Sequence, residues 1–372
     1  MTGQSVPSPA GGYTPFDHAC MARALQLAAR ALYTTTPNPR VGCVIAKDGV
    51  VIGEGWHQRA GGPHAEVHAL RQAGAAARGA DVYVTLEPCS HHGRTPPCAQ
   101  ALLDAGVRRV VAAMGDPNPQ VAGGGLALLQ AHGIATHCGL MEAQARQLNP
   151  GFISRMTHGR PWFTLKIAAS LDGRTALSNG VSQWITGPAA RADVQRLRAC
   201  SCAVMTGIGT VLADDPLLTV RELDIGRQPL RVVVDSRLRI PLQAKLLQGG
   251  ATLIACLAGQ EPKAAQLRAL GATVLELPEQ DGTVCLASLA QALAARDINE
   301  VLVEAGTKLS GGLLRQGLAD ELVLYYAPML LGNDARGMFA LPPLAAMSER
   351  VDLDILELSQ VGQDIRLRAR PR

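Results

Sequence analysis

The residues best suited to chemistry in this chain lie between positions 63 and 98. His64, Cys89 and Cys98 are good zinc ligands, with 24 residues between the first two and 8 between the cysteines. Catalytic zinc sites use three protein ligands and keep a fourth position open for water. Bound zinc lowers the pKa of this water from about 15.7 to about 7, so hydroxide exists at neutral pH. The spacing therefore predicts a catalytic zinc site.

Glu66 follows His64 by two residues and is the candidate proton carrier. A His-x-Glu pair followed by Pro-Cys and a further Cys is typical of enzymes that hydrolyse ring amino groups with zinc. Hydroxide attacks the ring carbon, and the glutamate carries the proton of the water to the departing ammonia. The alternative is a structural zinc site, which needs a fourth ligand. His68 is the only close candidate for that role, and we interpret it as a packing residue.

The predicted elements around these residues alternate between strands and helices. We expect a helix over 17–32 with Asp17 as its N-cap, because apolar residues recur there at helical spacing. Further helices are expected to begin at His64 and Cys98, each after a proline. Strands are expected over 41–45, 50–53, 82–86 and 107–114. Such alternation predicts a mixed or parallel sheet that is covered on both faces, with the zinc loop at the carboxyl end of a strand.

A second alternating pattern follows a Pro- and Gly-rich joint near residues 149–161, where we place a domain boundary. Strands are expected over 162–168, 203–207, 230–235, 251–257, 272–277, 301–304 and 322–327, with helices over 187–199 and 262–270. The strand ending at Glu304 runs into a loop from Gly306 to Gly312 before another helix. Such a loop binds phosphate when its backbone N–H groups point at an anion. An ordinary strand–helix turn is the alternative.

Charged residues in the second half have two interpretations. Arg191, Arg196 and Arg198 lie on one predicted helix, and Arg221 follows an Asp-Asp-Pro turn. Most such charges form a solvated face, whereas two arginines that converge on a phosphate would bind it. The segment from Lys166 to Arg174 is polar where a strand ends, and a plain hairpin turn explains it equally well.

The composition narrows the class of protein. The 372 residues suffice for two or three domains, and 47% hydrophobic with 18% charged residues is a globular composition. A net charge of +4 and 3% aromatic residues argue against a nucleic-acid-binding protein. Nine scattered cysteines predict reduced thiols and a cytoplasmic protein. Residues 1–15 show no signal peptide and are expected to form a disordered tail, and no apolar run is long enough to span a membrane.

Several longer stretches resemble one family, the bacterial bifunctional deaminase/reductase of riboflavin biosynthesis. They are Thr-Pro-Asn-Pro-Arg-Val-Gly at 36–42, His-Ala-Glu-Val-His-Ala at 64–69, the run from Thr85 to Cys98, Asp-Pro-Asn-Pro-Gln-Val-Ala-Gly at 116–123, Ser-Leu-Asp-Gly-Arg at 170–174, Ser-Gln-Trp-Ile-Thr at 182–186, Thr-Val-Leu-Ala-Asp-Asp-Pro at 210–216 and Val-Glu-Ala-Gly at 303–306. The resemblance covers about residues 17–370. The eight-residue gap between the cysteines separates this family from cytidine and nucleic-acid deaminases, whose gap is two.

The resemblance implies an α/β protein with two catalytic domains. A cytidine-deaminase-like α/β/α domain with a mixed sheet would occupy residues 16–158, and a dihydrofolate-reductase-like α/β domain residues 159–372. The first would use zinc to remove the 2-amino group of a diamino-hydroxy-phosphoribosylamino-pyrimidine. The second would use NADPH to reduce the ribosyl side chain of the product to ribityl. Phosphorylated pyrimidines would be the substrates, with no nucleic acid or membrane partner, and the protein would be a dimeric or tetrameric homo-oligomer.

The resemblance also implies residue roles. Zinc would be held by His64, Cys89 and Cys98, and Glu66 would be catalytic. Deaminase substrate would contact Asn38, His57 and Arg94. NADPH would contact Ala168, Trp184, Thr210, Asp214, Ser236 and the loop Gly306, Thr307, Lys308, Leu309, Ser310, Gly311 and Gly312. Reductase substrate would contact Ser182, Arg198, Leu218, Arg221 and Glu304. Lys308 departs from the family, which is often neutral there, and would contact a cofactor phosphate or water.

Two other interpretations of the function stay open at this point. In the first, the protein is a deaminase whose second half is a structural or dimerising module. The presence of Lys166, Asp172, Arg198, Arg221 and Glu304 together speaks against it. In the second, the protein is a nucleic-acid editing deaminase. The long gap between the cysteines, the low net charge and the few aromatic residues speak against that.

Overall fold

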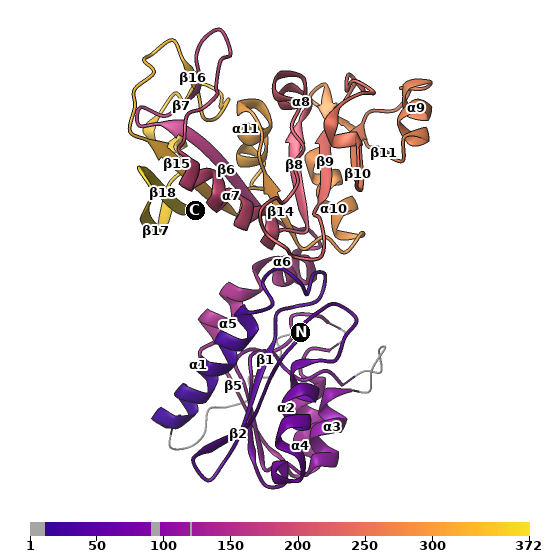
Figure 1. The fold of residues 1–372 in the computed structure, drawn as a ribbon, viewed down its shortest axis with the longest axis vertical. Coiled ribbons are helices and arrows are strands. Elements are labelled where there is room, and N and C mark those ends of the chain that lie inside the picture. Colours follow the sequence, from indigo (N-terminus) through magenta and orange to yellow (C-terminus); the bar gives the residue numbers. More distant parts are fainter. Residues whose placement is uncertain (1–11, 91–96, 120) are drawn as a thin grey trace. The chain divides into compact units, whose positions relative to one another are not determined.

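The computed structural model describes residues 12–90, 97–119 and 121–372. The chain divides into two compact units, Met1–Gly159 and Arg160–Arg372, shown in Figure 1. The division falls one residue after the boundary at 158 that the sequence suggests. Each unit has its own sheet and its own hydrophobic cores.

The described part of the first unit contains a five-stranded mixed sheet in the order β2-β1-β3-β4-β5. The strands are β1 (Gly42–Lys47), β2 (Val50–Trp56), β3 (Asp81–Val84), β4 (Arg109–Ala112) and β5 (Ala135–Cys138). β1 pairs antiparallel with β2 and β3, while β3, β4 and β5 are parallel. The prediction of a mixed sheet is therefore confirmed.

Helices cover both faces of this sheet (Figure 1). They are α1 (Pro15–Ala29), α2 (Ala65–Ala73), the short 3₁₀ helix η1 (Gly74–Ala77), α3 (Cys98–Ala105), α4 (Gly124–Ala131), α5 (Glu142–Leu148) and α6 (Pro150–His158). Side chains of β1 alternate between the faces, as a strand requires. Cys43 and Ile45 pack towards α2, α3 and α4, whereas Val44 and Ala46 pack towards α1.

The predicted N-cap of the first helix was wrong. Thr14 caps α1: its hydroxyl accepts from Asp17 N at 3.1 Å, and its N–H donates to the Asp17 carboxylate at 2.8 Å. This reciprocal pair is a capping box, so Asp17 lies at the third helical position. Thr14 and Pro15, which the sequence assigned to a disordered tail, are therefore part of the helix start, and residues 1–11 lie outside the described residues.

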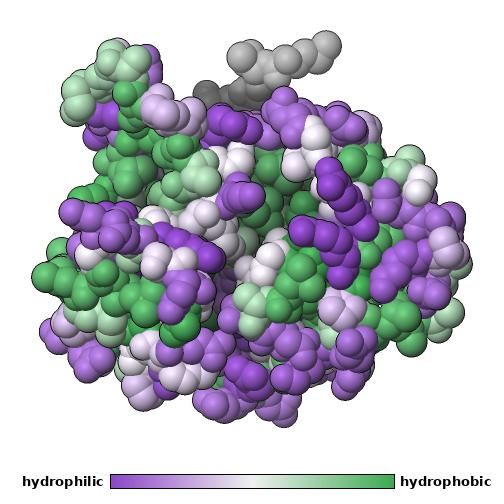
Figure 2. Space-filling view, turned by 90° about the horizontal axis from the view of Figure 1, so that it is seen from above, coloured by the Kyte–Doolittle hydropathy of each residue, from purple (hydrophilic) through white to green (hydrophobic). Residues whose placement is uncertain are grey.

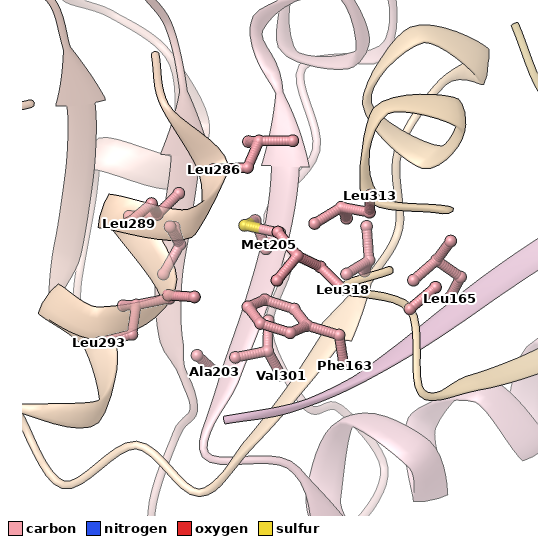
Figure 3. Close-up of a cluster of buried hydrophobic side chains, with 14 of the residues drawn as sticks. Phe163, Leu165, Ala203, Met205, Leu286, Leu289, Leu293, Val301, Leu313 and Leu318 are labelled. Atoms are coloured by element: carbon pink, nitrogen blue, oxygen red, sulfur yellow. The ribbon is translucent and has the colours of Figure 1, made fainter. Parts of the chain in front are cut away.

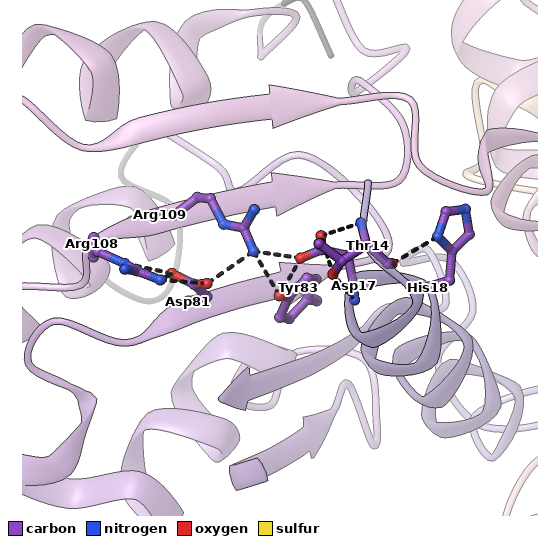
Figure 4. Close-up of polar contacts among 7 residues, drawn as sticks. All are labelled: Thr14, Asp17, His18, Asp81, Tyr83, Arg108 and Arg109. Atoms are coloured by element: carbon purple, nitrogen blue, oxygen red, sulfur yellow. Dashed lines mark hydrogen bonds and ion pairs between the residues drawn. The ribbon is translucent and has the colours of Figure 1, made fainter. Parts of the chain in front are cut away.

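Asp17 also joins α1 to the sheet (Figure 4). Tyr83 on β3 donates to Asp17 at 2.6 Å, and Arg109 on β4 bonds to Asp17, Tyr83 and Asp81. Burial opposes ionisation of Asp17, but these hydrogen bonds outweigh burial and lower its pKa to about 2. A cavity of about 450 Å³ opens beside this network and contains none of the candidate site residues.

The Asp17 network predicts an acid-sensitive part of the stability. The folded pKa, about 2, lies below the ordinary 3.8, so the contribution is present above about pH 4 and is lost as the pH falls towards 2. We expect Asp17→Asn to lower the free energy of unfolding of the first unit by about 2 kcal/mol at about pH 6. Near about pH 2.5 the two proteins should differ little. Denaturant unfolding measures both values, and an equal deficit at the two pH values would contradict the assignment.

The second unit, all of whose residues are described, contains a nine-stranded sheet in the order β11-β10-β9-β8-β14-β6-β15-β18-β17. Its strands are β6 (Trp162–Ser170), β8 (Ala203–Gly207), β9 (Leu230–Val234), β10 (Thr252–Cys256), β11 (Thr273–Glu276), β14 (Glu300–Val303), β15 (Glu321–Ala327), β17 (Leu353–Val361) and β18 (Asp364–Pro371). The strands from β11 to β15 are parallel, and β18 and β17 add an antiparallel edge.

Its helices are α7 (Pro188–Cys200), α8 (Ile208–Asp214), α9 (Lys263–Ala269), α10 (Leu286–Ala294) and α11 (Thr307–Arg315). Short strand pairs join β7 (Arg174–Ala176) to β16 (Arg336–Gly337) and β12 (Glu279–Gln280) to β13 (Thr283–Val284), and short 3₁₀ helices lie at Lys245–Leu247 and Met347–Glu349. Leucines of α10 pack beside Met205 and Phe163 of the sheet in the main core (Figure 3).

The predicted loop from Gly306 to Gly312 is not a loop. Gly306 is the N-cap of α11, and the other six residues lie inside that helix. Gly311 permits close packing, since a Cβ there would lie 2.5 Å from the Ala340 carbonyl oxygen. The sequence prediction also missed α5, α8, α10 and the β17–β18 hairpin. Within the described residues, no helix is both long and apolar enough to cross a membrane.

Candidate active sites

His64, Cys89 and Cys98 meet at one point in the first unit, with their ligand atoms within 4.8 Å of one another. His64 Nδ1 lies 3.2 Å from Cys98 Sγ and 3.7 Å from Cys89 Sγ. His64 is the N-cap of α2, Cys98 is the first residue of α3, and Cys89 follows β3. One imidazole and two thiolates are a donor set that suits zinc and leaves a fourth coordination position for water.

The surroundings of the cluster favour a thiolate and a proton carrier. A hydrogen bond from the Cys98 thiol lowers the pKa of Cys89 to about 4. Glu66, in the first turn of α2, is 3% exposed, and its burial raises the pKa of its carboxyl group. A raised pKa suits a group that must both take and give a proton near neutral pH.

The structure does not offer His68 as a fourth ligand. Its imidazole lies outside the cluster of possible metal ligands found among the described residues. Its Nε2 is buried and has no hydrogen-bond partner in that part of the chain. Among the described residues the cluster thus has three protein ligands, which is the number found in catalytic zinc sites.

Two of the three residues expected to contact the deaminase substrate lie beside the cluster. The His57 ring stands edge-on to the His64 ring, with the centroids 5.5 Å apart. His57 Nδ1 lies 3.0 Å from the Pro63 carbonyl oxygen, and its Nε2 lies 3.1 Å from Asn38 Nδ2. Burial lowers the pKa of His57, so the neutral ring can donate to Pro63 and accept from Asn38. Arg94 lies outside the described residues.

Sequence reasoning missed Glu87, two residues before Cys89. Its carboxylate is 4% exposed and accepts four backbone N–H groups from the segment 116–126. An acidic residue two positions before a predicted metal ligand was the available signal, but the sequence alone does not reveal its burial or backbone partners so far along the chain.

In the second unit, the expected cofactor residues gather at one edge of the sheet. Because β6, β8, β9 and β14 are parallel, their carboxyl ends meet at that edge. Ala168 lies near the end of β6, and Ser236 follows β9. Thr210 lies on α8, directly after β8, and Gly306 caps α11, shortly after β14. Open parallel sheets bind ligands in the crevice at such an edge. Seen from this side, hydrophobic and hydrophilic residues alternate over a hollowed surface (Figure 2).

The N-terminus of α11 is suited to an anion. No side chain caps this nine-residue helix, so its first N–H groups are not satisfied by a cap. Thr307 and Ser310 lie in its first turns. The Leu309 side chain lies next to Gly207, since a Cβ at Gly207 would be 3.7 Å from Leu309 Cδ2. Lys308 is exposed, which is compatible with either of its two expected roles.

Four charged side chains interact next to this edge. Arg198 of α7 holds the Glu304 carboxylate with two hydrogen bonds of 2.5 and 3.0 Å. Burial opposes ionisation of Glu304, but the charges of Arg198, Lys166 and Arg221 hold its pKa below the ordinary value. Burial lowers the pKa of Lys166, and the Glu304 charge opposes this change. A carboxylate between cations is ionised, and its presence keeps the cations in place.

The remaining predicted residues lie in loops around α7 and α8, except Asp214, which is the last residue of α8. Trp184 is 70% exposed and stacks with Arg191, whose guanidinium carbon is 4.7 Å from the ring centre. Asp214 accepts from Gln183 at 3.1 Å, so it lies near the segment that contains Ser182 and Trp184. Leu218 is buried, and the next carbonyl, of Thr219, accepts from Arg198 at 2.9 Å. Arg221 is exposed.

Fold and site together define a class of protein: a zinc deaminase domain followed by a nucleotide-dependent reductase domain. The model of the cytidine and deoxycytidylate deaminase zinc-binding region matches residues 14–114. The model of the RibD C-terminal domain matches residues 161–367. Both halves of the chain are therefore similar to known catalytic domains.

Whole-length relatives show the same arrangement. Riboflavin biosynthesis protein RibD of Escherichia coli K12 is 54% identical over 364 residues, or 94% of this chain and 98% of that protein. The solved structure of Acinetobacter baumannii RibD, form 1, has a TM-score of 0.89 at 49% identity and covers 96% of this chain and 99% of that one. The deaminase/reductase of Thermotoga maritima has a TM-score of 0.83 at 33% identity, with 96% and 99% covered.

This chain belongs to the RibD family of bifunctional deaminase/reductase enzymes of riboflavin biosynthesis. Its deaminase domain is of the zinc-binding kind and its reductase domain of the NADPH-dependent kind. The expected family, fold class, activities and cofactors are thereby confirmed. The alternative of a non-catalytic second half is contradicted by the reductase-domain match.

Proposed function

We propose that the two domains carry out successive steps on one phosphorylated pyrimidine. The first step is hydrolytic deamination of 2,5-diamino-6-(5-phosphoribosylamino)pyrimidin-4(3H)-one, and the second is reduction of the ribosyl side chain of 5-amino-6-(5-phosphoribosylamino)uracil to ribityl. The name of the Thermotoga maritima relative supports these substrates. The observation that carries the proposal is the cluster of His64, Cys89 and Cys98 beside buried Glu66.

In the deaminase, His64, Cys89 and Cys98 would hold the zinc ion, which would supply an acidified water. Glu66 would take a proton as the water oxygen bonds to the ring carbon and would give it to the amino nitrogen as the C–N bond breaks, so that ammonia departs and a ring carbonyl remains. Asn38 and His57 contact the pyrimidine, and the His57–Pro63 bond fixes the His57 ring. Arg94 is proposed to meet the phosphate, because a guanidinium is permanently charged and forked.

In the reductase, NADPH supplies the hydride when bound. The N-terminus of α11, from Gly306 to Gly312, holds one of its phosphates. The other proposed cofactor contacts are Ala168, Trp184, Thr210, Asp214 and Ser236, around the same sheet edge. The proposed substrate contacts are Ser182, Arg198, Leu218, Arg221 and Glu304. Arg198 donates to Glu304 and to the Thr219 carbonyl, and the N–H groups that remain are proposed to bind the substrate phosphate together with Arg221.

The proposed sequence of reactions is tested by supplying the diaminopyrimidine with and without NADPH. We expect the ribityl product with NADPH and the deaminated product alone without it, both identified by mass. Cys98→Ser should lose zinc, because a neutral hydroxyl is a poor zinc ligand, and should lose deamination. The same variant should still oxidise NADPH when given the deaminated intermediate. A full equivalent of zinc in Cys98→Ser would exclude Cys98 as a ligand.

Glu66→Gln separates proton transfer from metal binding. Glutamine has the size of glutamate without its charge. Because Glu66 lies outside the metal-ligand cluster, the variant should keep its zinc. Its deamination rate should fall by about 10²–10⁴, the usual contribution of a general acid–base group. Metal analysis and single-turnover rates on the same sample measure both quantities. Near-normal turnover in zinc-loaded Glu66→Gln would rule out the proton-carrier role.

Arg221→Ala tests the substrate phosphate site. A hydrogen bond to a charged group contributes about 1.5–3 kcal/mol, and the exposure of Arg221 puts its contribution at the low end of that range. The substrate KM should therefore rise by roughly tenfold or more, with the KM for NADPH nearly unchanged. Arg221 is a better position for this substitution than Arg198, because loss of Arg198 would also leave Glu304 without its bidentate partner. A normal substrate KM with weakened NADPH binding would assign Arg221 to the cofactor instead.

We also propose that the protein is a homo-oligomer, a dimer or tetramer, in the cytoplasm, with no nucleic acid or membrane partner. Free cysteines throughout the described chain fit a reducing compartment. β17 is an edge strand with unpaired backbone groups, and Ile355 and Leu358 on it are 66% and 67% exposed. An edge strand with exposed apolar side chains favours pairing with a strand of another chain. Light scattering should give at least a dimer mass, reduced in the Ile355→Glu, Leu358→Glu double variant, and a monomeric wild type would contradict this.

A further inference from the structure

Glu87 forms an unusual link between two segments of the deaminase domain. One carboxylate oxygen accepts from Asp116 N at 3.1 Å and Gly123 N at 3.0 Å. The other accepts from Gly125 N at 3.0 Å and Leu126 N at 3.2 Å. A carboxylate offers about four acceptor positions, so this buried group is fully occupied by backbone donors.

Three of these donors belong to the start of α4. Gly123 is its N-cap, in a left-handed conformation, and no side chain from the helix itself caps it. The Glu87 carboxylate takes the place of that cap from outside the helix. A negative charge at the positive end of a helix is stabilising, and each N–H at a helix start needs an acceptor. The link is therefore strong and specific to the start of α4.

The same link fixes the backbone that leads to Cys89. Gly125 lies directly against Pro88, because a Cβ at Gly125 would be 1.8 Å from the Pro88 carbonyl oxygen. On the other side, the Cys89 carbonyl accepts from Ala99 N at 3.1 Å, and the Cys89 sulfur accepts from Cys98 N at 3.4 Å. Cys89 is thus held between α4 and α3, with Glu87 and Pro88 forming the α4 side.

We propose that Glu87 is a positioning residue for the metal site: by binding the start of α4, it sets the place of the Cys89 thiolate. Glu87 is not in the group of possible metal ligands, so it acts through Cys89 and not by contact with the ion. The inference rests on the proposed ligand role of Cys89. Residues that orient metal ligands typically change metal affinity by about 10–100-fold when mutated.

The test is zinc affinity in the full-length protein, measured by competition with a chromophoric chelator. Glu87→Gln keeps the size of the side chain and one acceptor oxygen, but it places an NH₂ group against two backbone N–H donors. We expect its affinity for zinc to be about 10–100-fold weaker than that of the wild type. Unchanged zinc affinity in folded Glu87→Gln would overturn the proposal, even if the domain were less stable.

Asp17→Asn is the matched control, because Asp17 is also a buried carboxylate at a helix start in the same domain. It bonds to α1, β3 and β4 and to none of the metal-binding segments. Both variants should lower the melting temperature of the zinc-free domain, but only Glu87→Gln should weaken zinc binding. An equal loss of zinc affinity in both would show that general destabilisation is the cause and would overturn the proposal.

Gly125→Ala approaches the same contact from the α4 side without altering any charge. The added methyl group must displace the Pro88 carbonyl, so this variant should also bind zinc more weakly. It decides the question if Glu87→Gln does not fold, and wild-type affinity in Gly125→Ala would then overturn the proposal. Cys89→Ser is measured in parallel. Normal zinc affinity there would show that the ligand assignment, and not the role of Glu87, is the part that fails.

Discussion

Close packing of α2 on the strand pair β1–β2 is the constraint on which the metal site depends. A Cβ at Gly53 would lie 2.4 Å from the Ala69 carbonyl oxygen, and a Cβ at Gly55 would lie 2.3 Å from that of Ala65. Glycine at both positions lets the helix backbone lie directly on the strand. Because His64 is the N-cap of this helix, the packing fixes where the imidazole meets the two cysteines. A side chain at either glycine would move the helix and, with it, one metal ligand.

In the reductase domain, charged side chains lie next to the hydrophobic core of the sheet. Lys166, Arg198 and Glu304 come from a strand, a helix and the residue after a strand, and all have low exposure. Burying any of them alone would be costly, since an unpaired charge loses its hydration. The bidentate Arg198–Glu304 pair offsets that cost. The negative charge of Glu304 also favours the protonated form of Lys166. These pairings thus hold the charges in fixed positions beside the core.

The sequence alone predicted the elements that have a strong local pattern. It failed where a feature depends on contacts with residues far away in the chain. Residue type and spacing were sufficient for His64, Cys89 and Cys98, which the structure brings together. The pair Gly311-Gly312 suggested a loop, but tertiary packing against Ala340 accommodates these glycines within α11. The N-cap of α1 was misplaced because Asp17 is also a good capping residue, and the choice of Thr14 depends on the reciprocal bond between the two. The predicted contact residues, such as Trp184 and Arg221, stay predictions, because nothing in their local sequence fixes their distance to a ligand.

Buried carboxylates from distant segments cap a helix in each domain. In the deaminase domain Glu87 accepts from the start of α4, and in the reductase domain Asp364 accepts from Gly187 N, the N-cap of α7, at 2.8 Å. Neither Gly123 nor Gly187 can cap its own helix with a side chain, so the helix start must find an acceptor elsewhere. Each bond then does two things: it satisfies a helix terminus, and it ties a functional segment to a remote part of its domain. Glu87 leads into Cys89, the proposed metal ligand, and Gly187 follows the segment that contains Ser182 and Trp184. The local sequence does not reveal the role of such residues, because their partners are backbone groups that only the fold brings near.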